Sequence, residues 1–205
     1  MFSKLLYTYL DWTMRRIPPP PPHIMKTIII DPGHGMGNRN RGQYDPGACS
    51  GVYTEAGIAM DWGNELRQIM IDRGYKVVRT RIDPRDPCPV SRRADIAESY
   101  GGDIMISLHC NAANGIASGT ETFYRGSDDR EMAIKLTDAI CSVLGTKNRG
   151  PKTEKDSQHS SLAVMEFDKC WLLEIGFIDN PSDRSKMLDA EIRRKACAAI
   201  ADVIG

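Results

Sequence analysis

The stretch Asp103-Ile104-Met105-Ile106-Ser107-Leu108 decides the fold of this chain, because it is a short and almost unbroken apolar run. A run of this length is typical of a strand that is covered on both faces, as in the middle of a parallel sheet. His109 follows directly, so an imidazole stands at the end of this run. We therefore expect a central, buried strand with a polar side chain at its carboxyl end.

Further strand-like runs flank this stretch along the chain and alternate with helical patterns. Strands are expected at residues 27–30, 75–80, 120–124 and 169–175, with a short candidate at 162–165. Apolar residues at helical spacing predict helices at residues 55–73, 91–99 and 128–144, and from Asn180 to the end of the chain. Gly74 and Gly145 stand where helices commonly end. This alternation predicts an α/β fold with a largely parallel sheet.

The composition excludes several classes of protein. The 205 residues include 27 basic and 27 acidic side chains, a balance that does not favour nucleic acid or an anionic membrane as partner. No apolar run is long enough for a transmembrane segment. The six cysteines form no CxxC pair, so we expect buried free thiols and no structural zinc knuckle.

The N-terminal part differs in character from the rest of the chain. Five prolines, Pro18 to Pro22, predict a stiff, extended linker. The preceding apolar stretch is short, contains Asp11 and lacks a small-residue cleavage site, so it resembles a signal peptide only superficially. We therefore expect an N-terminal extension at residues 1–25, a catalytic domain at residues 26–205, and synthesis in the cytoplasm without a clear signal peptide.

Two histidines and two glutamates stand in or beside the predicted strands and the first helix: His34, Glu55, His109 and Glu174. Two histidines and one carboxylate, with a fourth position open, are typical of a catalytic zinc site. A second carboxylate nearby could accept a proton from the attacking water. The set indicates hydrolysis, and spacing alone does not tell which glutamate would bind the metal.

Each of these residues also has an ordinary structural interpretation. His34, between two glycines, fits an exposed turn, and His109 fits a hydrogen-bonded core histidine. Glu55 fits the helix dipole at the start of the first helix. Glu174 is different, because a carboxylate in such an apolar run is seldom buried without a partner. Cys110 should point away from His109 on a strand, so we assign it to the core.

Several motifs in this order resemble the catalytic domain of zinc-dependent N-acetylmuramoyl-L-alanine amidases, which cleave peptidoglycan in bacterial wall remodelling and phage lysis. The motifs are Ile30-Asp31-Pro32-Gly33-His34-Gly35, Asp45-Pro46-Gly47-Ala48, Glu55, Arg79-Thr80-Arg81, Ser107-Leu108-His109-Cys110-Asn111-Ala112 and Leu173-Glu174-Ile175-Gly176-Phe177-Ile178-Asp179-Asn180. The resemblance covers nearly everything from Thr27 onward. This chain departs from the usual pattern in the loop from Met36 to Tyr44, which is richer in asparagine and arginine, and at Ala56, where lysine is common.

The resemblance implies a twisted, mainly parallel six-stranded sheet with helices on both faces. It implies that His34, Glu55 and His109 bind Zn²⁺ and that Glu174 is the catalytic carboxylate. The implied reaction is hydrolysis of the amide between N-acetylmuramic acid and L-alanine, by a monomer that acts on peptidoglycan at the cell wall or periplasm. A compact domain without a clear export signal suits an endolysin, and an exported bacterial remodelling enzyme is the alternative.

Two other functions stay open on the sequence. Another zinc peptidase, such as a carboxypeptidase acting on wall peptides, would need an arginine to bind a free terminal carboxylate, and the chain has several arginines. A non-catalytic wall-binding protein could use the same fold without chemistry. The presence of Glu174 together with both histidines and Glu55 favours an enzyme.

Overall fold

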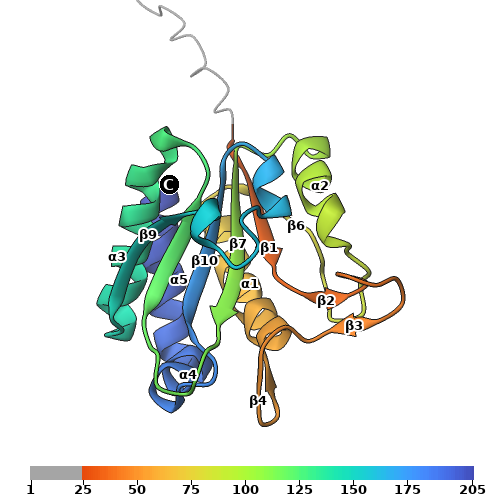
Figure 1. Ribbon diagram of the computed structural model, residues 1–205. Helices are drawn as coiled ribbons and strands as arrows, with labels where there is room; N and C mark the ends of the chain where they lie inside the picture. The colour runs from red at the N-terminus through yellow and green to blue at the C-terminus, as the bar shows by residue number, and fades with distance from the viewer. Residues whose placement is uncertain (1–24) are drawn as a thin grey trace, which may run out of the picture.

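The computed structural model describes residues 25–205, and its centre is a six-stranded sheet in the order β6-β1-β7-β10-β8-β9 (Figure 1). The strands are β1 (Thr27–Pro32), β6 (Lys76–Arg79), β7 (Ile104–Asn111), β8 (Thr120–Tyr124), β9 (Asn148–Thr153) and β10 (Cys170–Phe177). All neighbouring pairs are parallel except β10 with β8. The expected six-stranded, mainly parallel sheet is confirmed, and the run at 104–108 lies within a central strand.

Helices cover both faces of this sheet. They are α1 (Glu55–Asp72), α2 (Arg93–Ser99), α3 (Arg130–Leu144), α4 (Pro181–Leu188) and α5 (Ala190–Ile204). Alternate residues of β1 face opposite sides: Ile28 and Ile30 pack in the larger core cluster with residues of α1, α3 and α5, while Ile29 packs in a second cluster with residues of α2. All three isoleucines are fully buried, so the continuous apolar pattern reflects burial on both faces.

Two elements differ from the expectation. Residues 162–165 were expected to form a strand, but Ala163–Glu166 is a 3₁₀ helix. Its adjacent side chains Val164 and Met165 are both buried in the second cluster, which a strand with alternating faces would not achieve on one side. The edge strand β9 was not expected, because Asn148–Thr153 has no apolar alternation. The final helical region divides into α4 and α5 at Asp189, which caps α5.

The start of α1 is fixed by local hydrogen bonding. Thr54 adopts an extended conformation and its side chain accepts from the Gly57 amide at 3.2 Å. This N-cap places Glu55 in the first turn, where the helix dipole favours a carboxylate. The helix end therefore sets the position of Glu55 relative to the sheet.

The loop between β1 and α1 contains two small hairpins. They are formed by β2 (Gly35–Met36) with β3 (Tyr44–Asp45), and by β4 (Cys49–Ser50) with β5 (Tyr53–Thr54). In Figure 1 both project beside the carboxyl end of β1. The loop between β1 and α1 is therefore folded around the residues that follow β1.

No helix within residues 25–205 is long and apolar enough to span a membrane. All six cysteines are free, and four of them are buried as expected: Cys88, Cys110, Cys170 and Cys197. The expected N-terminal extension lies, apart from Met25, outside the described residues.

Candidate active site

His34 lies in a tight turn between β1 and β2. Its φ of 59° is in the left-handed region, which residues other than glycine rarely adopt. Two buried arginines hold this turn by its carbonyl oxygens: Arg93 Nη2 donates to His34 at 2.8 Å, and Arg81 Nη2 donates to Gly33 at 2.8 Å. The backbone strain is therefore sustained by charged hydrogen bonds from the protein interior.

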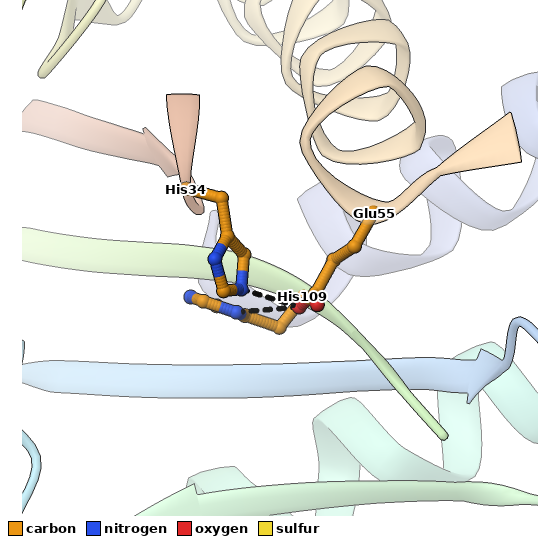
Figure 2. Close-up of side chains that lie close together, drawn as sticks. All are labelled: His34, Glu55 and His109. Atoms are coloured by element: carbon orange, nitrogen blue, oxygen red, sulfur yellow. Dashed lines mark hydrogen bonds and ion pairs between the residues drawn. The ribbon is translucent and has the colours of Figure 1, made fainter. Parts of the chain in front are cut away.

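His34, Glu55 and His109 converge at the carboxyl ends of β1 and β7 and the start of α1 (Figure 2). Glu55 Oε1 lies 3.0 Å from His34 Nε2 and 2.8 Å from His109 Nδ1. The two imidazole rings meet edge to face with centroids 4.9 Å apart. One donor atom from each residue lies within 4.8 Å of the others, so the group could hold a metal ion.

Glu55 is the central residue of this group, because it contacts both histidines. Its Oε1 also accepts from the Cys110 amide at 3.0 Å, and its Oε2 accepts from the Ala48 amide at 2.9 Å. Burial raises the pKa of Glu55, but hydrogen bonds and charges from His109 and His34 outweigh it and lower the pKa overall. Glu55 is therefore a buried anion. A carboxylate must be deprotonated in this way to bind a metal ion.

Asp45 orients His34 from the other side of the ring. Its Oδ2 lies 3.0 Å from His34 Nδ1, and the Asn38 amide and the Gly47 N–H donate to the same carboxylate at 2.6 and 2.9 Å. Burial raises the pKa of Asp45, but these donors together lower it to about 2. With Nδ1 engaged by a carboxylate, Nε2 of His34 is left to face Glu55 and His109, an arrangement typical of metal-binding histidines.

Two glycines allow the side chains to approach this closely. A Cβ on Gly33 would lie 2.4 Å from His109 Cε1, and a Cβ on Gly47 would lie 2.5 Å from Glu55 Oε2. Gly47 also has a φ of 67°. The DPG sequences before His34 and before α1 therefore make room for the imidazole and carboxylate groups.

Glu174 lies beside His109, because β10 and β7 pair in parallel with these two residues in register. On its other side Glu174 pairs with Glu121 of β8. Glu174 Oε2 is buried and has no hydrogen-bond partner within the described residues. Burial, and then the charges of Glu55 and Glu121, raise the pKa of Glu174 well above its usual range. A carboxylate whose pKa is raised is a stronger base than an ordinary glutamate, which suits a proton acceptor.

Glu121 is a buried carboxylate that the sequence analysis did not single out. It accepts from Asn111 Nδ2 at 2.9 Å and forms ion pairs with Arg149 at 2.6 Å and Lys152 at 2.8 Å. Asp45 was part of a quoted motif but had no assigned role. Asp45 contacts His34, 11 positions away, and Glu121 pairs with Arg149, 28 positions away, so the folded loop and sheet bring these partners together. Cys110 is buried, as expected, and takes no part through its side chain.

Comparison with known proteins agrees with this geometry. The sequence profile of a family described as N-acetylmuramoyl-L-alanine amidase matches residues 28–205. An uncharacterized cell wall amidase of Bacillus anthracis is 30% identical over 194 residues, which cover 85% of this chain and 34% of that protein. The N-acetylmuramoyl-L-alanine amidase LytC of Bacillus subtilis is 29% identical over 188 residues, which cover 88% of this chain and 35% of LytC.

A solved structure of an N-acetylmuramoyl-L-alanine amidase from Clostridium difficile superposes with a TM-score of 0.75 at 25% identity. The match covers 88% of this chain and 95% of that one. The chain thus spans about a third of the length of the two curated relatives above and nearly all of this solved domain.

Proposed function

Because this chain belongs to the N-acetylmuramoyl-L-alanine amidase family, we propose that it hydrolyses the amide bond between N-acetylmuramic acid and L-alanine in peptidoglycan. The convergence of His34, Glu55 and His109 beside Glu174 is the observation that supports this activity most directly. A relative described as a cell wall amidase supports the same substrate. We propose the cell wall or periplasm as the place of action, in lysis or in wall remodelling.

We propose His34, Glu55 and His109 as the ligands of one Zn²⁺ per chain. The donor set fits zinc, because two imidazoles and one carboxylate are a common catalytic shell with a fourth position open. The buried, anionic Glu55 and the hydrogen bond that His34 Nδ1 donates to Asp45 also fit the group. When bound, zinc supplies a Lewis acid that polarises the amide carbonyl and activates water.

Glu174 is proposed to move the proton. Its carboxylate accepts a proton from the attacking water and delivers it to the leaving nitrogen of L-alanine. The raised pKa of Glu174, caused by burial and by Glu55 and Glu121, supports a role as the group that takes up the proton of the attacking water. Asp45 keeps the imidazole of His34 in one orientation throughout.

The decisive experiment is digestion of purified peptidoglycan by the zinc-loaded protein, with analysis of the new chain ends. We expect new N-terminal L-alanine together with intact N-acetylmuramic acid. Release of a free C-terminal amino acid would identify a carboxypeptidase instead. Binding to peptidoglycan without any new chain end would identify a non-catalytic wall-binding protein.

The ligand assignment is tested separately by metal analysis. Replacing either histidine, as His34→Ala or His109→Ala, is expected to abolish both zinc binding and hydrolysis, because three protein ligands are typical of a stable catalytic site. Elemental analysis after gel filtration measures the bound zinc. Stoichiometric zinc in the His109→Ala protein would contradict the assignment.

A further inference from the structure

Arg149 stands at the end of a row of polar side chains that begins at the candidate active site and crosses the sheet. His109 of β7 is in register with Glu174 of β10, and Glu174 is in register with Glu121 of β8. Residues in register on neighbouring strands project from the same face, so these three side chains stand side by side. Glu121 in turn pairs with Arg149 of β9 at 2.6 Å. The row therefore joins a candidate metal ligand to the edge strand.

The side chain of Arg149 reaches from β9 back to the carboxyl end of β10. Its Cζ lies 5.0 Å from the centre of the Phe177 ring, which is beyond Glu174 on the same strand. Gly119 leaves room for this path, because a Cβ there would lie 2.8 Å from Arg149 Cγ. Since strands lie about 4.8 Å apart and residues follow at about 3.3 Å along a strand, the guanidinium is on the order of 10 Å from the Glu174 carboxylate.

This end of the row carries more positive than negative charge. Arg149 Nε and Lys152 Nζ lie 2.6 and 2.8 Å from the same oxygen of Glu121, so two cations share one carboxylate. The other oxygen of Glu121 accepts from Asn111 Nδ2 at 2.9 Å. Both cationic side chains are 29% exposed. Within residues 25–205, the hydrogen bonding of the Arg149 side chain involves only its Nε, so both Nη groups are left to face solvent or a ligand.

An ion pair beside a sheet edge has an ordinary structural role, which one cation can fill. Lys152 is in register with Phe123, and Phe123 with Leu172, so Lys152 lies toward the middle of the sheet and can offset the charge of Glu121 there. Arg149 is the second cation, and it lies at the strand end where ligands bind in open α/β sheets. A fixed guanidinium with its outer nitrogens free is suited to donate to an oxygen acceptor.

We propose that Arg149 binds the substrate, and that its Nη groups donate to a carbonyl or carboxylate oxygen located on the order of 10 Å from the scissile amide. The proposal rests on the proposed function and adds a binding residue to it. With the amide beside His109 and Glu174, the rest of the substrate crosses β10 and β8 along the polar row. Arg149 then holds it at the far end, while Glu121 and the Phe177 ring hold the guanidinium in place.

The test measures binding in full-length, zinc-loaded protein that carries Glu174→Gln, which is expected to slow turnover enough for titration calorimetry. Arg149→Gln is added to this parent, and Lys152→Gln is the matched control, because it removes a cation of equal exposure from the same oxygen of Glu121. Each protein is titrated with a soluble muropeptide and with the same muropeptide after its carboxylates are converted to amides. Thermal unfolding verifies the fold. If Arg149→Gln does not fold, Arg149→Lys replaces it, because lysine keeps the charge beside Glu121 without the planar fork.

We expect Arg149→Gln to weaken binding about threefold to tenfold, the range for a partly exposed charged contact, and Lys152→Gln to leave the affinity unchanged. A loss with both forms of the muropeptide identifies a carbonyl as the acceptor, and a loss with the unmodified form alone identifies a carboxylate. Unchanged affinity in the Arg149 variant would overturn the proposal. An equal loss in both variants would also overturn it, because Arg149 would then act only through Glu121. Failure of the proposed function is a separate result: the wild type would release no N-terminal L-alanine, whatever the affinities.

Discussion

At the scale of single residues, Glu174 combines a proposed role with an electrostatic cost. Its Oε2 atom is buried and has no hydrogen-bond partner among residues 25–205, and burial followed by the charges of Glu55 and Glu121 raises its pKa. Glu174→Gln keeps the shape but cannot take a proton, so we expect about a 10²–10⁴-fold loss of hydrolysis with zinc retained. Glu98→Gln, on an exposed part of α2, is the control. Near wild-type turnover by the Glu174→Gln protein would exclude Glu174 as the proton acceptor.

The same substitution has an expected effect on stability. The pKa of Glu174 is higher in the folded protein than in the unfolded chain, so stability falls as the pH rises through the folded value. Glutamine does not ionise, and the metal-free Glu174→Gln protein should unfold at the same or a higher temperature than the wild type at neutral pH. Calorimetry on both metal-free proteins measures this. A clear drop in unfolding temperature would mean that Glu174 stabilises the fold.

The neighbours of Glu174 provide a test with opposite signs. Glu121 raises the pKa of Glu174 and Lys152 lowers it. We therefore expect Glu121→Gln to move the acidic limb of the kcat/KM profile to lower pH, and Lys152→Met to move it to higher pH. The pH dependence of hydrolysis, measured with all three proteins under identical salt, checks both directions. If both variants shift the acidic limb in the same direction, this limb reflects the titration of a group other than Glu174.

Single residues also show which parts of the candidate site could be predicted from the sequence alone. The sequence named four residues that the fold brings to one edge of the sheet, because each stands at or near the end of a recognisable element. It assigned no role to Asp45, and it did not single out Glu121 or Arg93. Several of their contacts join positions far apart in the chain: Glu121 pairs with Arg149, 28 positions away, and Arg93 with Asp31, 62 positions away. The ligand and catalytic roles themselves stay predictions.

At the scale of elements, the glycine at the start of the second small hairpin is the most informative position. Gly47 and Gly51 both have positive φ, 67° and 61°, but only a Cβ on Gly47 would meet Glu55 and His34. Gly51→Ala therefore measures backbone strain alone, and Gly47→Ala adds displacement of the metal-binding side chains. We expect backbone strain to cost about 1–2 kcal/mol of stability at each position, a further loss at Gly47 from the clash with Glu55 and His34, and roughly 10–100-fold weaker zinc binding only for Gly47→Ala. Competition with a chelator measures the affinity, and equal zinc affinities would contradict the steric argument.

The longer elements with a clear apolar pattern were predicted correctly, but an edge strand and a short apolar segment were not. Residues 27–30 and 105–108 are buried, so the local apolar pattern of these two strands agrees with their place in the core. The residues of edge strand β9 are only partly buried or exposed. Its pairing with β8 therefore leaves no apolar pattern in its own sequence from which a strand could be predicted. The segment at 162–165 has an apolar composition that fits a strand or a helical turn equally, and packing against α2 selects the turn.

At the scale of the whole molecule, the catalytic domain is proposed to be complete from about Lys26. Thr27 is tied into the fold by its amide, which donates to Asp103 Oδ2 at 2.7 Å, and the buried side chain of Ile204 closes the core at the other end. A chain that begins at Met25 should therefore keep its unfolding temperature and its hydrolysis of soluble muropeptide. A chain that begins at Ile30 loses the buried residues Ile28 and Ile29 and should not fold.

The same pair of truncated chains tests what residues 1–24 contribute. The stretch before the prolines contains aromatic and apolar residues together with Arg15 and Arg16, a composition that could lie on a membrane or wall surface. If it does so, the chain that begins at Met25 will act more slowly on whole cells while its rate on soluble muropeptide is unchanged. An equal loss on both substrates would show that residues 1–24 support the catalytic fold itself, and the proposed domain boundary would be wrong. The chain that begins at Ile30 is expected to be inactive on whole cells and on soluble muropeptide. It therefore serves as the control for complete loss of the fold.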